Sequence, residues 1–195
     1  MRLGVLGGTF DPVHIGHLLL GESAREQLSL DKVLFVPAGE PWRKQGRQIS
    51  VAEDRLAMLR LAVGGNQAFE VSTIEVDREG PSYTIDTLEA LRSERPNDEL
   101  FFIVGADALD DMPTWREPER IFELATVVVA GRPVDSDSER PVGPGIRADG
   151  ISAIDMPSIA LSSSEVRQRL AQGRTIRYMV PEAVEQYIRE HRLYR

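Results

Sequence analysis

The segment from Gly7 to His17 reads GGTFDPVHIGH and follows directly on the short apolar stretch Arg2–Leu6, RLGVL. The apolar stretch is typical of a buried first strand, and the two glycines after it let backbone N–H groups approach an anion without an intervening Cβ. His14 and His17 are three residues apart, so on a helix they share one face near its positive end. The segment therefore predicts a strand, a glycine turn and a helix that together bind phosphate.

The helix after this turn is predicted over Ile15–Leu30, where apolar residues recur at helical spacing. Asp11 and Pro12 match an N-cap followed by a first-turn proline. Thr9 adds a hydroxyl donor beside the glycines, and Gly16 keeps the surface between the two histidines open. Because imidazole titrates near pH ~6.5, we expect both histidines to donate hydrogen bonds to phosphate oxygens at neutral pH.

Other interpretations of the histidines have less support. A lone histidine is usually a polar residue with satisfied hydrogen bonds, but here two of the chain's three histidines stand at helical spacing after a glycine turn. A zinc site needs more ligands, and no third one is evident, so no metal ligands are predicted. The segment contains neither the G-x-x-x-x-G-K-[ST] loop nor the G-x-G-x-x-G fingerprint of other nucleotide-binding proteins.

Apolar strands alternate with helices along the rest of the chain. Further strands are predicted over Lys32–Pro37, Phe69–Val76, Glu99–Val104, Ala125–Ala130 and Ile151–Ile154. Further helices are predicted over Val51–Val63, Tyr83–Arg95, Glu119–Leu124, Ser162–Ala171 and Pro181–His191, and loops over Ala38–Ser50 and Arg132–Asp149. This alternation favours an α/β fold with a mainly parallel sheet covered on both faces, in which ligands bind at the carboxyl ends of the strands.

Composition limits the classes of protein that fit. The 195 residues suit one domain, and no internal repeat or second core is visible, so a single domain over 1–195 is predicted. No cysteine is present, and a formal net charge of −8 disfavours a nucleic-acid partner. No stretch approaches the ~18–20 apolar residues of a membrane span, and the apolar start is too short for a signal peptide. We expect a cytoplasmic protein without membrane contact; a homo-oligomer is left open.

A second motif lies near the other end of the chain, where Leu161–Arg167 reads LSSSEVR. Ser162 and Glu165 have the spacing of a capping box, which alone would indicate only the start of a helix. Ser163 and the serine after it lie one turn from Arg167. A helix N-terminus, serine hydroxyls and a guanidinium together favour binding of a triphosphate.

GGTFDPVHIGH and LSSSEVR resemble the paired (H/T)xGH and ISSTxIR signatures of the nucleotidyltransferase superfamily. Within it, the chain is similar to the bacterial nicotinate-nucleotide adenylyltransferases over nearly its whole length. Further matching segments are PAGEPWRK (Pro37–Lys44), PSYTIDTLEAL (Pro81–Leu91), FFIVGADALDDMPTWRE (Phe101–Glu117) and VPEAVEQYIREHRLY (Val180–Tyr194). The resemblance implies a Rossmann-like, doubly wound fold with a small C-terminal helical region over about residues 162–195.

The resemblance also implies roles for individual residues. Catalytic roles are expected for His14, His17 and Arg167. The ATP site is expected to comprise Gly8, Thr9, Phe10, His17, Gly105, Asp107, Ser163 and Arg167. The acceptor site is expected to comprise Lys44, Thr84, Asp107 and Trp115. A tryptophan face suits a positively charged pyridinium ring, and a threonine hydroxyl at a helix start suits a carboxylate.

Simpler roles remain open for several of these residues. Trp115 could be a core aromatic, Asp107 an N-cap after Gly105, and Lys44 part of a solvated basic loop. Many relatives have PPHK where this chain has Pro41–Lys44, PWRK, so a histidine is replaced by arginine there. In this loop the chain departs from the family pattern.

The family makes nicotinate adenine dinucleotide and pyrophosphate from ATP and nicotinate mononucleotide during NAD synthesis. The resemblance implies direct in-line transfer without a protein nucleophile, with Mg²⁺ arriving on ATP and held mainly by phosphates and water. Two alternatives stay open: adenylyl or cytidylyl transfer to another phosphate acceptor, and a nucleotide sensor without catalysis. His14–His17 also spells the HIGH motif of some tRNA synthetases, but the chain is short, acidic and lacks their lysine loop.

Overall fold

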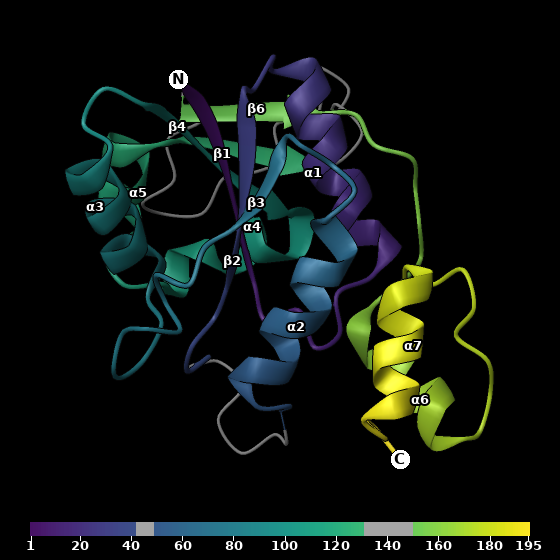
Figure 1. The fold of residues 1–195 in the computed structure, drawn as a ribbon. Coiled ribbons are helices and arrows are strands. Elements are labelled where there is room, and N and C mark those ends of the chain that lie inside the picture. The colour runs from purple at the N-terminus through teal and green to yellow at the C-terminus, as the bar shows by residue number, and fades with distance from the viewer. Residues whose placement is uncertain (42–48, 131–149) are drawn as a thin grey trace.

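The computed structural model describes residues 1–41, 49–130 and 150–195. Its centre is a sheet of six strands in the order β3-β2-β1-β4-β5-β6, in which every described pair is parallel (Figure 1). The strands are β1 (Arg2–Gly8), β2 (Lys32–Pro37), β3 (Phe69–Val71), β4 (Glu99–Gly105), β5 (Thr126–Ala130) and β6 (Ile151–Ile154). The order reverses direction between β1 and β4, which confirms the expected doubly wound, Rossmann-like fold.

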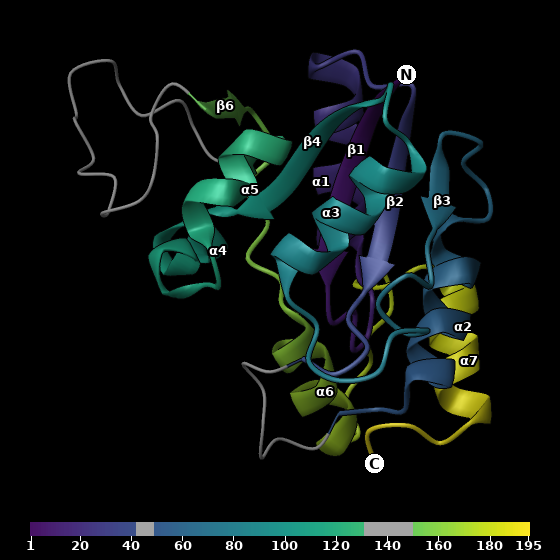
Figure 2. The same ribbon diagram turned by 90° about the vertical axis from the view of Figure 1, so that its left-hand side faces the viewer.

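Helices cover both faces of this sheet, as Figures 1 and 2 show from two sides. One core contains Phe35, Phe101 and Ile103 and is closed by α1 (Ile15–Gln27), α2 (Ala52–Val63), α6 (Ser163–Ala171) and α7 (Glu182–Glu190). The other contains Val5 and Phe102 and is closed by α3 (Thr84–Glu94), α4 (Ala106–Asp111), a 3₁₀ turn (Met112–Thr114) and α5 (Pro118–Leu124). Neighbouring residues of β4 thus enter opposite cores, because side chains alternate along a strand.

Most predicted elements are present with shifted ends, but the strand expected over Phe69–Val76 is too long. β3 ends at Val71, and the Ser72 N–H still donates to the Phe35 carbonyl at 3.0 Å. After that point the chain turns. The Asp77 N–H donates to the Thr73 carbonyl at 2.8 Å, and the Thr73 hydroxyl donates to the Asp77 carboxylate. Short polar side chains that bond to nearby groups compete in this way with strand pairing.

The predicted start and end of the first helix also need correction. Asp11 is not its N-cap: Asp11 and Pro12 form a cis peptide in the preceding turn, and His14 caps the helix instead. At the other end α1 stops at Gln27, because Ser29 adopts a left-handed conformation with φ of 50°. The sequence pattern also missed α4 and the 3₁₀ turn, which together connect β4 to Trp115.

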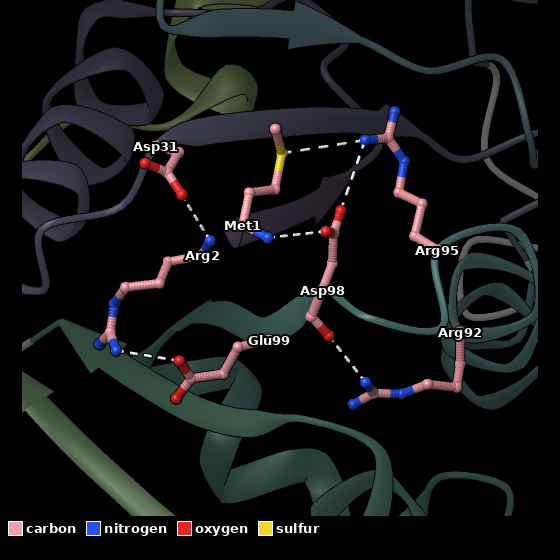
Figure 3. A network of polar contacts seen from close by, with 7 residues as sticks. All are labelled: Met1, Arg2, Asp31, Arg92, Arg95, Asp98 and Glu99. Carbon is pink, nitrogen blue, oxygen red and sulfur yellow. Dashed lines mark hydrogen bonds and ion pairs between the residues drawn. The ribbon is translucent and has the colours of Figure 1, made fainter.

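A network of charged groups joins the amino ends of β1 and β4 (Figure 3). The ammonium group of Met1 lies 2.8 Å from Asp98 Oδ1, and Arg95 approaches the same carboxylate at 3.6 Å. Beside them, Arg2 and Glu99 pair at 2.9 Å. The network connects β1 and β4 at their amino ends, which is the end of the sheet opposite to the predicted binding site.

Removing the Asp98 charge from this network should weaken the fold at neutral pH but have little effect at low pH. The hydrogen bond from the Met1 ammonium is the main reason that the pKa of Asp98 lies below its usual value. A lowered folded-state pKa stabilises the protein above the unfolded-state pKa, and this stabilisation is lost as the pH falls through the folded-state pKa.

We therefore expect Asp98→Asn to lower the midpoint of thermal unfolding slightly at pH 7, because exposed ion pairs contribute little. The difference from the wild type should shrink below pH ~4. Thermal unfolding followed by circular dichroism across this range checks the prediction. An equal difference at pH 3 and pH 7 would show that the substitution acts through packing instead.

Candidate functional site

A cavity of about 610 Å³ lies at the carboxyl ends of β1 and β4, where the strand order reverses. Ligands of doubly wound sheets bind at this position. Most residues predicted for the site line this cavity together: Gly8, Thr9, His14, His17, Thr84, Gly105, Asp107, Trp115, Ser163 and Arg167. Lys44 and most of the loop around it lie outside the described residues, as does the loop predicted over Arg132–Asp149.

Phe10 is the one described residue of the predicted set that does not line the cavity. Its side chain is only 1% exposed and packs in the core. The ring lies under Gly8, where a Cβ would come within 3.0 Å of it, and its edge contacts the His17 ring at a centroid distance of 5.0 Å. Phe10 therefore supports the end of β1 and His17 from behind, and a side chain at position 8 would press against its ring.

His14 and His17 lie against each other at the start of α1. His14 is the N-cap in extended conformation rather than part of the helix, and the two rings stack with centroids 3.7 Å apart. The backbone N–H of His14 donates to His17 Nδ1 at 3.1 Å. Because this nitrogen accepts a hydrogen bond, the proton of a neutral His17 ring resides on Nε2.

The electrostatic state of His14 differs from the sequence-based expectation. Its side chain is 6% exposed, and this burial lowers the pKa of His14 to about 4. The ring is therefore neutral at pH 7 in this structure, with one N–H to donate instead of two. Its Nδ1 atom is buried and has no hydrogen-bond partner among the described residues.

The two sequence motifs, far apart in the chain, are hydrogen-bonded to each other. Ser162 caps α6 as predicted, accepting from the Glu165 N–H at 3.1 Å. The Ser163 hydroxyl donates to the Pro12 carbonyl at 2.9 Å, and Arg167 Nη1 donates to the Asp11 carbonyl at 2.6 Å. The N-terminus of α6 is thereby fixed against the turn that precedes His14.

A buried arginine holds this turn from the other side. Arg55 on α2 is 2% exposed, and burial lowers the pKa of its guanidinium. It donates to four carbonyl oxygens, those of Thr9, Ala38, Gly39 and Ser50, at 2.6–3.2 Å. The sequence analysis missed Arg55, although its position on α2, three and four residues before the buried Met58 and Leu59, places it on the apolar face.

The opposite wall of the cavity carries Thr84 and Trp115. Thr84 is the first residue of α3, while Trp115 follows the 3₁₀ turn and packs edge-on against Phe102 at a centroid distance of 6.1 Å. Trp115 is half-buried, and its Nε1 has no hydrogen-bond partner among the described residues. Gly105 is the N-cap of α4, and Asp107 lies exposed in the first turn.

Sequence reasoning also missed Glu75, a buried residue that lines the cavity beside Thr84. The Thr87 hydroxyl donates to Glu75 Oε1 at 2.7 Å, and burial raises the pKa of Glu75. The Glu75 backbone carbonyl lies so close to Gly39 that a Cβ there would approach it to 2.2 Å. Glu75 thus joins α3 to the segment after β2, and Gly39 permits the close backbone contact.

Neither a metal cluster nor a membrane-spanning helix is found in the described ranges. No group of three or more His, Cys, Asp or Glu residues in them is placed to hold a metal ion. Similarly, none of the described helices is long and apolar enough to cross a membrane.

Comparison with known proteins adds evidence that is independent of this geometry. Residues 5–169 match the family model for cytidylyltransferase-like proteins. A probable nicotinate-nucleotide adenylyltransferase of Thermomicrobium roseum is 50% identical, over 100% of this chain and 92% of its own length. One of Thermus thermophilus is 48% identical over the full length of both chains.

Solved structures share the fold at lower sequence similarity. The nicotinic acid mononucleotide adenylyltransferase of Plasmodium falciparum, complexed with NaAD, superposes with a TM-score of 0.78. The two sequences are 18% identical, over 99% of this chain and 97% of the other. The full-length identity to the bacterial relatives, together with the matched family model, shows that this chain belongs to the nicotinate-nucleotide adenylyltransferase family of the cytidylyltransferase-like proteins.

Proposed function

We propose that the chain transfers the adenylyl group of ATP to nicotinate mononucleotide, giving nicotinate adenine dinucleotide and pyrophosphate in NAD synthesis. The observation that carries this proposal is one cavity with two chemically different walls. One wall holds the glycine turn, the paired histidines and the start of α6, and the other holds Thr84 and Trp115. The named activity of relatives up to 50% identical over the full chain supports the same conclusion.

The wall formed by β1, α1 and α6 suits the ATP phosphates. Gly8 and Thr9 would offer backbone and hydroxyl donors, and His17 would donate from Nε2, because its Nδ1 is already engaged. Ser163 is the first residue of α6, where the helix dipole favours an anion, and Arg167 follows one turn later on the same helix. Two N–H groups of Arg167 bond to Asp11 and Ser164, so a guanidinium with five N–H groups has others for a phosphate.

The opposite wall suits the acceptor. The face of Trp115 would stack on the pyridinium ring, and the Thr84 hydroxyl with the N-terminus of α3 would bind the nicotinate carboxylate. Gly105 and Asp107 lie at the end of β4, next to the point where the two substrates would meet, and suit ribose hydroxyls. Lys44 remains a predicted phosphate contact from the loop after β2.

The reaction needs no protein nucleophile. A phosphate oxygen of nicotinate mononucleotide would form a bond to the α-phosphorus of ATP as the bond to the leaving pyrophosphate breaks in line. The protein would contribute positioning and stabilisation of the charge on the phosphate oxygens, which are the main sources of catalysis in phosphoryl transfer. His14, His17 and Arg167 are the groups to which we assign this stabilisation.

We propose that Mg²⁺ enters with ATP. The side chains along the phosphate wall are hydroxyl, imidazole and guanidinium groups, whereas Mg²⁺ prefers carboxylate, phosphate and water oxygens. The ion would therefore be held mainly by the ATP phosphates and water, and it would neutralise part of their charge. The cytoplasmic location stays a prediction, and the oligomeric state stays open.

Pyrophosphate release tests the proposed function directly. With ATP and Mg²⁺, we expect turnover with nicotinate mononucleotide and much slower turnover with phosphopantetheine or with CTP in place of ATP. Nicotinamide mononucleotide should react less well, because it lacks the carboxylate expected at the α3 N-terminus. Binding of ATP in calorimetry without turnover of any acceptor would favour a sensor and overturn the proposal.

Substitution of the paired histidines tests their assignment. We expect His14→Ala and His17→Ala each to lower kcat/KM by at least about 100-fold, comparable to the loss of one donor from an oxyanion site. His191→Ala is the matched control, since the third histidine stacks on Tyr187 at the exposed end of α7. Steady-state rates within a few-fold of wild type for His14→Ala would refute this assignment of the site.

The low pKa of His14 predicts proton uptake on ATP binding. A nearby phosphate favours the charged imidazolium, so ATP should raise the pKa of His14 from about 4 toward the assay pH. Calorimetry at pH 5.5 in buffers of different ionisation enthalpy should detect uptake of up to one proton per ATP. The uptake should decrease at pH 8 and disappear in His14→Asn; the same uptake in that variant would assign the proton to another group.

A further inference from the structure

The C-terminal end of the chain returns to the turn that precedes the paired histidines. The Tyr194 hydroxyl donates to Asp11 Oδ1 at 2.6 Å, across 183 positions of sequence. The Tyr194 ring packs against the same core as α1, α2 and α7. Burial and the neighbouring carboxylate raise the pKa of Tyr194, so its hydroxyl stays a donor. The contact joins Asp11 of the first motif to a residue outside both main motifs.

Asp11 connects Tyr194 to the phosphate wall. Asp11 is buried, with only 3% of its surface exposed. The positive charge of the Arg55 guanidinium attracts its carboxylate. The backbone carbonyl of Asp11 accepts from Arg167, and the next carbonyl, that of Pro12, accepts from Ser163. The side chain and the backbone of one residue thus join the chain terminus to the start of α6.

We propose that Tyr194 is a positioning residue for the ATP phosphates, acting through Asp11 on Arg167 and on the turn before His14; this rests on the proposed adenylyl transfer. A buried carboxylate that loses a hydrogen-bond donor must find another partner or move. Movement of Asp11 displaces the carbonyl that holds Arg167, and small displacements of positioned groups have large effects on rate. The acceptor wall has no share in this connection.

Tyr187 provides a matched control within the same C-terminal region. Its hydroxyl donates to Asp54 Oδ1 at 2.8 Å, which joins α7 to α2 by the same type of bond. This pair does not include the Asp11–Pro12 turn. Tyr194→Phe and Tyr187→Phe each remove one tyrosine–aspartate hydrogen bond and keep the aromatic ring. Tyr194→Phe also removes a contact with the Ser50 side chain, so the kinetic difference between ATP and the acceptor is the deciding measurement.

The test compares both variants with the wild-type chain by thermal unfolding and steady-state kinetics. For Tyr194→Phe we expect the KM for ATP to rise about five- to ten-fold and kcat to fall, with the KM for nicotinate mononucleotide unchanged, because positioned groups tolerate little displacement. For Tyr187→Phe we expect wild-type kinetics despite a loss of thermal stability. Unchanged ATP kinetics in Tyr194→Phe, or equal changes in both KM values, would overturn the proposal.

Two further measurements keep the test decisive. If Tyr194→Phe does not fold, Asp11→Asn weakens the same charge-assisted bond from the other side and should raise the KM for ATP by a smaller factor; an unchanged KM would overturn the proposal. If the wild type does not release pyrophosphate, the proposed function fails. In that case calorimetric affinities for a non-hydrolysable ATP analogue still test the role of Tyr194. The proposal requires that Tyr194→Phe bind the analogue more weakly than Tyr187→Phe does.

Discussion

The buried guanidinium of Arg55 is the interaction on which the site depends. A charged group in the core is unfavourable unless its hydrogen bonds are satisfied, and here four backbone carbonyls accept from it. These carbonyls follow the ends of the paired strands β1 and β2 and precede α2, so one guanidinium joins the segments that leave the sheet to the start of a helix. Because arginine keeps its charge even when burial lowers its pKa, the connection persists across the physiological pH range.

This arrangement explains how a glycine turn can be held in place. Gly7 and Gly8 end β1 and still pair with β2, whereas the turn from Thr9 to Val13 lies beyond the strand and is held by groups that contact its carbonyls. Arg55 holds Thr9 from one side, while Ser163 and Arg167 hold Pro12 and Asp11 from the other. Donors fixed before the substrate arrives need no reorganisation during the reaction, which is the condition for strong electrostatic stabilisation.

The sequence predicted the parts of the site whose evidence is local. The strand, glycine turn and helix from Arg2 to Gln27 lie within one continuous segment, and the cap of α6 follows from the spacing of Ser162 and Glu165. Arg55, Glu75 and Tyr194 could not be recognised in the same way, since their partners are distant carbonyl, hydroxyl or carboxyl groups. A pattern of apolar residues shows that a helix face is buried, but it does not show which polar side chain is buried with that face or which groups it bonds to.

The charge of His14 illustrates a limit of a different kind. Residue type and spacing identify an imidazole near phosphate, but its pKa depends on burial, which only the fold determines. The two buried side-chain atoms that lack partners in the described ranges, His14 Nδ1 and Trp115 Nε1, both belong to residues that line the cavity. Buried polar atoms are rarely left unpaired. Each wall of the cavity thus has one unpaired polar atom among its described residues. Polar ligands bound along both walls, such as an adenylyl donor and its acceptor, would supply the missing partners.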